Sequence, residues 1–146
     1  MPLLARKGVL AIAAVVDVAM QPKGHPISAK MLAARHDLPP RHLEPVLQAL
    51  VRDGILRGIR GPRGGYELGR EGHLVTANDI LRAAGSVEDN EAATTGSELV
   101  KKIVLPALAE AEAEFAVALG RINIEDMARS AQGVMKRQRV PHPSRG

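Results

Sequence analysis

The feature that most constrains the fold of this chain is a glycine-rich turn in its first half. The turn consists of Gly61, Pro62, Arg63, Gly64 and Gly65. It separates two short β-type stretches, at 55–60 and 66–68, and its glycines can take positive φ angles. The sequence therefore predicts a β-hairpin here. Because the hairpin directly follows two predicted helices, it is either the wing of a winged helix or a plain surface hairpin.

The two helices before the hairpin form the outline of a helix-turn-helix. We predict them at 28–36 and 41–52, with Ser28 as the N-cap of the first. A tight turn joins them, because Pro39 and Pro40 each bias the preceding residue away from helical geometry. The apolar residues of the second helix share one face: Leu43, Val46, Leu47 and Leu50.

The rest of the chain is also predicted to be mainly helical. Further helices are expected at 3–20, at 76–82, at 98–119 and, as a short last helix, from 123 onwards. Thr76 and Asp79 have the spacing of a capping box, and Asn123 and Asp126 have the same spacing. A loop without periodicity is expected at 86–96. The predicted fold class is therefore mainly α with a small β-hairpin.

The longest predicted helix carries an apolar stripe that no further domain of this chain is predicted to cover. Its members recur at spacings of three and four: Val100, Ile103, Val104, Leu108, Ala111 and Phe115. Pro106 either kinks this helix or marks its true start. The stripe either packs against its twin in a second subunit or folds back on its own domain, and we favour the homodimer.

Charge is distributed unevenly along the chain. Residues 1–70 hold 11 Lys or Arg against 5 Asp or Glu, whereas residues 71–135 hold 5 against 11. Residues 136–146 add four basic side chains and no acidic one. A basic half joined to an acidic half suggests that only one part faces a polyanion. Ordinary surface charge is the alternative.

The residue types exclude several kinds of chemistry. The sequence contains no cysteine, which excludes disulfides, thiolate metal sites and cysteine nucleophiles. The five histidines show no metal-ligand spacing, so we predict neither a metal site nor a cofactor. The glycine-rich turn lacks the strand-then-helix context of a nucleotide site. We expect no enzyme activity and no catalytic residue.

No apolar run reaches the roughly 20 residues that span a bilayer. The most apolar stretch, 9–20, is interrupted by Asp17 and preceded by Arg6 and Lys7. A short secretory signal is conceivable there, but no clear small-residue cleavage site follows it. We interpret the stretch as a helix of a cytoplasmic protein without a membrane segment.

A family resemblance rests on segments distributed over most of the chain. These are Ile27-Ser28, Leu32-Ala33, 38–44, Gly54-Ile55-Leu56, 60–68 and Thr76. Together they resemble the Rrf2 family of bacterial transcription regulators over about residues 3–130. The glycine-rich wing is the most specific part of the resemblance.

The resemblance implies a winged-helix domain, a long dimerisation helix and a homodimer on double-stranded DNA with a roughly palindromic operator. The matching DNA-binding positions are Ser28, Arg41, His42, Glu44, Arg60 and the turn residues Gly61, Pro62, Arg63, Gly64 and Gly65. An arginine can donate twice to guanine, and a glutamate can accept from cytosine. His42 has the alternative role of a polar residue at the rim, and Glu44 that of a partner for Arg41.

The implied organisation has four parts. Residues 1–85 form the winged helix-turn-helix DNA-binding domain, and residues 86–97 form a flexible loop. Residues 98–132 hold the dimerisation helix and the final short helix. Residues 133–146 form a basic, disordered tail.

One departure from the family pattern bears on regulation. Well-studied members carry three cysteines after the wing that ligate an iron–sulfur cluster, and the corresponding region here, 86–107, has none. The leading hypothesis is a sequence-specific regulator, and within it a repressor, that works without such a cluster. Its signal is a small molecule, a partner protein or nothing.

The alternative hypothesis is a winged-helix module that binds a protein and does not read DNA. A cluster of three arginines, Arg57, Arg60 and Arg63, distinguishes the two hypotheses. Neutralising these charges would weaken DNA binding and its salt dependence, whereas a protein-binding module would tolerate the change.

Overall fold

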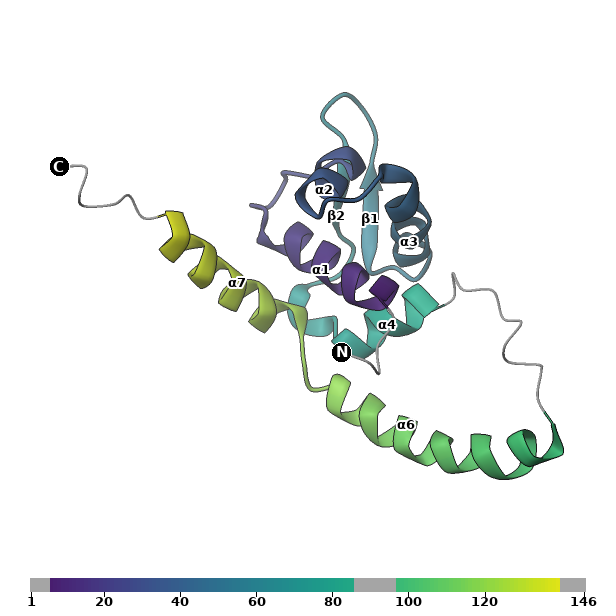
Figure 1. Ribbon diagram of the computed structural model, residues 1–146. Coiled ribbons are helices and arrows are strands. Elements are labelled where there is room, and N and C mark those ends of the chain that lie inside the picture. The colour runs from purple at the N-terminus through teal and green to yellow at the C-terminus, as the bar shows by residue number, and fades with distance from the viewer. Residues whose placement is uncertain (1–5, 86–96, 140–146) are drawn as a thin grey trace.

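The computed structural model describes residues 6–85 and 97–139 and confirms the mainly helical fold class with one β-hairpin (Figure 1). The helices are α1 (Arg6–Met20), α2 (Ala29–Arg35), α3 (Pro40–Arg52), α4 (Ala77–Gly85), α6 (Leu105–Leu119) and α7 (Ile124–Arg139). The strands are β1 (Leu56–Ile59) and β2 (Gly65–Leu68), and the short turns are the 3₁₀ turn η1 (Gly72–Leu74) and the π-helical turn η2 (Val100–Val104).

The core of the N-terminal part is aliphatic and is centred on α1. Ala11, Ala14 and Val15 of α1 are fully buried, and they belong to one cluster with Leu47 of α3 and Ile80 of α4. The helix α1 also contacts α7, which lies along its side. The apolar pattern of α1 is thus explained by burial in a folded domain.

The helix α2 ends in a Schellman motif, which begins the turn to α3. The Leu38 N–H donates to the Ala33 carbonyl (2.9 Å) and the Asp37 N–H to the Ala34 carbonyl (3.3 Å). Asp37 takes a left-handed φ of 55°, which the short polar side chain of aspartate tolerates better than most. Pro40 then occupies the first helical position of α3. The predicted helix-turn-helix is therefore present.

The hairpin pairs its two strands antiparallel and is tied to the start of α2. Leu56 is opposite Leu68, and Ile59 is opposite Gly65. A further bridge joins Ile27 to Tyr66, with the Tyr66 N–H donating to the Ile27 carbonyl at 2.8 Å. The wing and the first residues of the helix-turn-helix are consequently held in a fixed relation.

The predicted capping residues are found in their expected roles. The Asp79 N–H donates to Thr76 Oγ1 (3.1 Å), and the Thr76 N–H donates back to Asp79 Oδ2 (3.0 Å). At the start of α7, the Asp126 N–H donates to Asn123 Oδ1 (2.8 Å). Helical residues run without a break from Glu98 through the π-helical turn η2 to Leu119, so Pro106, in the first turn of α6, does not mark the start of the predicted helix.

The C-terminal half differs from expectation in one respect. We predicted a short last helix and a disordered tail from 133, but α7 extends from Ile124 to Arg139. Ile124 and Ala128 are buried against the domain, and such packing stabilises a helix beyond its intrinsic propensity. The predicted loop at 86–96 and the residues at 3–5 and 140–146 lie outside the described residues.

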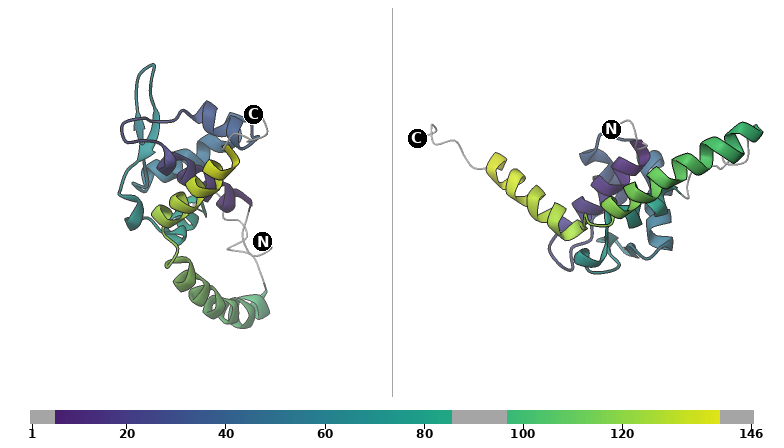
Figure 2. Two further views of the ribbon diagram at one scale, coloured as in Figure 1. Left: turned by 90° about the vertical axis from the view of Figure 1, so that its left-hand side faces the viewer. Right: turned by 90° about the horizontal axis from the view of Figure 1, so that it is seen from below.

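The hairpin tip and α6 lie at opposite ends of the molecule. In Figure 1 the hairpin rises at the top and α6 crosses the bottom, and the left view of Figure 2 shows the same separation. A surface at the hairpin end and a surface on α6 can therefore bind different partners at the same time.

Candidate nucleic-acid interface

The exposed face of α3 carries the residues predicted to read bases. Arg41, His42 and Glu44 are exposed, whereas Leu43 and Leu47 are buried behind them. Within residues 6–85 no ion pair joins Arg41 to Glu44, although the sequence left this pairing open. Both side chains are therefore available to an external partner.

Ser28 and the first turn of α2 lie beside this helix in the helix-turn-helix. The Met31 N–H donates to Ser28 Oγ at 3.1 Å, which confirms the predicted N-cap. The hydroxyl proton of Ser28 is still free to be donated to a ligand.

The wing presents the predicted turn residues at its tip. Arg60, Gly61, Pro62 and Arg63 are exposed, and Arg60 and Arg63 form no ion pair within the part of the chain that the structure describes. A polyanion would therefore meet two uncompensated guanidinium groups at the wing.

The predicted cluster of three arginines is reduced to two. Arg57 and Glu67 lie opposite each other in the hairpin and form an ion pair, with Arg57 Nε donating to Glu67 Oε2 at 3.1 Å. Cross-strand neighbours of opposite charge pair in this way. The expectation that Arg57 acts together with Arg60 and Arg63 is not supported, because its charge is compensated within the hairpin.

Two wing glycines are required by contacts within the protein. A Cβ added to Gly64 would lie 2.1 Å from the Ile59 carbonyl oxygen, and one added to Gly65 would lie 2.4 Å from that of Ile27. Gly65 also has a φ of +154°, which side-chain-bearing residues rarely adopt. These glycines let the hairpin turn tightly, as the sequence predicts, and let it approach the start of α2, which the sequence did not reveal.

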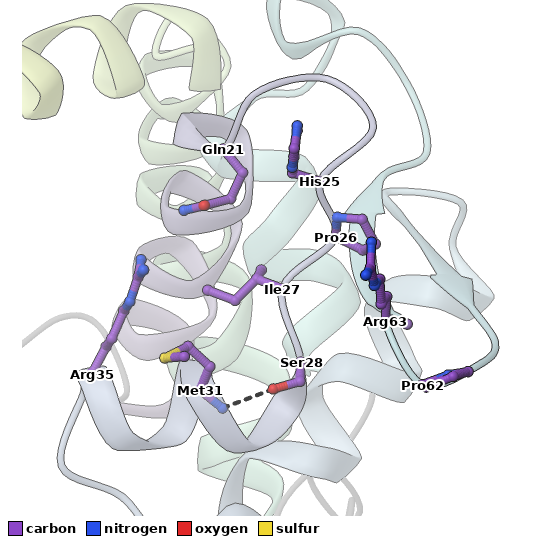
Figure 3. Close-up of a pocket in the computed structure, with 10 residues that line it drawn as sticks. Gln21, His25, Pro26, Ile27, Ser28, Met31, Arg35, Pro62 and Arg63 are labelled. Atoms are coloured by element: carbon purple, nitrogen blue, oxygen red, sulfur yellow. Dashed lines mark hydrogen bonds between the residues drawn. The ribbon is translucent and has the colours of Figure 1, made fainter.

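An open hollow lies between the wing tip and the loop that joins α1 to α2. We call it the loop–wing hollow (Figure 3). It is lined by residues 25–28 of the loop, by Gln21, Met31 and Arg35, and by wing residues 62–64. Sequence reasoning did not include His25 in the site, because the loop becomes a neighbour of the wing only through the bridge between Ile27 and Tyr66.

The residues predicted for dimerisation lie on η2 and α6. Ile103 and Leu108 are 61% and 60% exposed, Val104 and Ala111 are exposed, and Val100 and Phe115 are half-buried. An apolar stripe of this kind is rarely left open to water. The single chain therefore leaves the predicted dimerisation face uncovered.

The donor set for a metal is poor. The whole sequence has no cysteine, and in the described ranges 6–85 and 97–139 no group of three or more histidine or acidic side chains could hold a metal ion. A thiolate-bound iron–sulfur cluster does not fit the residues of this chain.

Comparison with known families shows to which family this chain belongs. Residues 4–130 match the model of the Rrf2 family, which is described as an iron-dependent transcriptional regulator. The chain belongs to the Rrf2 family. The resemblance stated from the sequence is thereby confirmed, and with it the assignment to transcriptional regulators and not to enzymes.

Individual relatives agree with the family assignment. The HTH-type transcriptional regulator IscR of Vibrio campbellii is 29% identical over 86 residues, which cover 59% of this chain and 51% of that protein. The chain spans about half the length of the curated relatives it matches.

Solved structures match a larger share of this Rrf2-family chain. The structure of CymR, the global cysteine regulator of B. subtilis, has a TM-score of 0.65 and 28% identity, and the match covers 87% of this chain and 96% of the CymR chain. The structure of T. potens IscR has a TM-score of 0.67 and 27% identity, and the match covers 90% of this chain and 89% of that chain.

In the part of the chain that the structure describes, no helix has the length and apolar character needed to cross a membrane.

Proposed function

We propose that this Rrf2-family chain is a sequence-specific DNA-binding repressor that binds a roughly palindromic operator as a homodimer, without an iron–sulfur cluster. The observation that carries the proposal is the wing. Its two exposed arginines, Arg60 and Arg63, have no ion-pair partner in the described residues, and they are held beside a helix-turn-helix with an exposed polar face. Such a surface supplies both phosphate contacts and base contacts.

The roles of the residues follow from their chemistry. Arg41 and Glu44 on α3 can donate to guanine and accept from cytosine in the major groove. Arg60 at the wing fits the minor groove or its phosphates, where arginine is favoured. Ser28 has a hydroxyl proton available for a backbone phosphate.

The uncovered stripe of α6 supports a homodimer. A second copy packed against Ile103 and Leu108 would remove these exposed apolar side chains from water. Two-fold symmetry then presents two wings and two α3 helices to one DNA molecule, and a symmetric dimer reads a palindrome. Because the hairpin and α6 lie at opposite ends of the molecule, the dimer contact leaves the wing free (Figure 1).

Independence from an iron–sulfur cluster is supported by the absence of thiolate donors from the sequence. The signal that controls DNA binding is then a small molecule, a partner protein or nothing. Repression is the simpler outcome of operator binding, because a protein bound at a promoter blocks polymerase without needing a further contact.

The proposal is tested by selection from a randomised double-stranded DNA library with the full chain. We expect recovery of an inverted repeat whose half-sites are separated by about one helical turn, ~10 base pairs, or a multiple of it. Equal binding to all sequences, or no retained DNA, would contradict the proposal and favour a protein-binding winged helix.

A further inference from the structure

The loop–wing hollow has an unusual set of polar side chains. Its lining includes His25, Arg35, Arg63 and Ser28, and it contains no aspartate or glutamate. A second open hollow, partly formed by the same loop, is lined by Glu67, Glu71 and Glu125 together with basic residues. The first hollow therefore suits an anion, and the second does not.

The walls of the loop–wing hollow are fixed relative to each other. Ile27 and Tyr66 exchange two backbone hydrogen bonds, at 3.1 and 2.8 Å, directly beneath the wing turn. Ser28 caps α2 on one wall, and Gly64, directly before the return strand β2, lies on the other. Figure 3 shows His25 on the loop, Arg63 on the wing and the Ser28 hydroxyl lower in the view, at the start of α2.

The charges around the hollow are not all equally available. Arg35 is bound to Asp17, with 2.5 Å between Nη1 and Oδ1. The side chains of His25 and Arg63 are both exposed and form no hydrogen bond or ion pair with another side chain of the described residues. These two side chains are thus free to bind an anion that enters from solvent.

We propose that the loop–wing hollow receives a phosphate group of the DNA backbone, and that His25 is a DNA contact in addition to the helix and wing residues. The inference rests on the proposed function. The hollow is open to solvent and is walled by the wing tip and the start of α2, so a long polyanion can pass through it. A free phosphate ion shares the same chemistry, and the test separates the two sources.

The test compares substitutions at His25 with the same substitutions at His73. His73 is exposed on η1 and lines only the second hollow. For the selected operator, His25→Glu should lower affinity at least tenfold. His25→Lys should raise affinity and steepen the slope of log affinity against log salt by about 0.9, the value for one further phosphate contact. His73→Glu and His73→Lys should change the affinity less than threefold.

Two further measurements locate the bound group. Replacing single phosphates by neutral methylphosphonates should identify one position per half-site where the penalty of His25→Glu disappears. Inorganic phosphate, added at constant ionic strength, should not compete with the operator. If it does compete, and no methylphosphonate position cancels the penalty, the hollow binds a free anion and the inference is wrong.

The outcomes also separate this inference from the function on which it rests. If the wild-type chain selects no DNA sequence, the proposed function fails. If the wild type selects an operator but the His25 variants behave like the His73 variants, only the contact at the loop–wing hollow is disproved. Urea denaturation of each variant shows whether the fold is retained, which is expected because both histidines are exposed.

Discussion

Asp17 of α1 and Arg35 of α2 form an ion pair, with 2.5 Å between Oδ1 and Nη1. Asp17 is only 8% exposed and is the one buried charged residue among those the structure describes. His36 Nε2 donates to the second carboxylate oxygen at 3.2 Å. Arg35 and His36 directly precede the turn that leads into α3, so the carboxylate of Asp17 fixes the helix-turn-helix to α1.

Asp17→Asn should therefore destabilise the fold. The substitution removes the charge that holds Arg35 and His36, and hydrogen bonds to charged groups contribute about 1.5–3 kcal/mol. The free energy of unfolding, measured by urea denaturation, should fall by that amount. Glu67→Gln is the matched control, because it removes the carboxylate charge of an ion pair whose Arg57 side chain is 63% exposed. Its cost should stay below about 1 kcal/mol, and equal costs for the two variants would contradict the role of Asp17.

Gly65→Ala should disrupt the junction between the wing and α2. The added Cβ would lie 2.4 Å from the Ile27 carbonyl oxygen, so the bridge to Tyr66 has to open. We expect operator affinity to fall more than tenfold, together with faster amide exchange at Ile27 and Tyr66. Gly58→Ala in the same hairpin is the control, since nothing lies within 4 Å of its Cβ. The prediction is wrong if Gly58→Ala weakens binding as strongly.

Leu108→Glu should yield a monomer. The side chain is 60% exposed in the single chain and lies in the predicted dimerisation stripe, and a carboxylate there would be buried without a partner in the dimer. Sedimentation velocity should show dimers for the wild type and monomers for Leu108→Glu. Ala109→Glu, one residue further along α6 and about 100° around the helix, should remain dimeric. A monomeric wild type, or a dimeric Leu108→Glu, would show that this stripe has another function.

Iron should have no effect on DNA binding. The family is described as iron-dependent, but this chain has no thiolate to hold a cluster. Anaerobic incubation with ferrous iron and sulfide, followed by desalting, should leave the absorbance spectrum and the operator affinity unchanged. A stable visible absorbance band that accompanies altered affinity would contradict a cluster-free mechanism.

Local signals explain why much of the fold was predictable. Ser28, Thr76 and Asn123 cap helices through bonds to residues three positions away, and such contacts depend only on nearby sequence. The glycine-rich turn fixed the position of the hairpin for the same reason. The length of α7 was not predictable in this way, because α7 packs along α1, where Gln132 Nε2 donates to the Met20 carbonyl oxygen, a residue far away in the sequence.

Site residues that share one helix could be predicted from the sequence. Site residues that are brought together by tertiary pairing were missed. Arg41 and Glu44 lie on the exposed face that the apolar pattern of α3 predicts. The ion pair of Arg57 needed the strand register, and the place of His25 needed the bridge between Ile27 and Tyr66. Neither relation is encoded by a local sequence pattern.

The most direct test of the account is the affinity of the wild type, Arg60→Ala and Arg82→Ala for the selected operator at two salt concentrations. Arg82 is an exposed arginine of α4, away from the wing, and serves as the control. We predict tight, selective binding that Arg60→Ala weakens by about 1–3 kcal/mol and that Arg82→Ala leaves nearly unchanged. Selective binding to which Arg60 contributes no more than Arg82, or binding that is equal for all DNA, would contradict the central claim that the wing takes part in reading an operator.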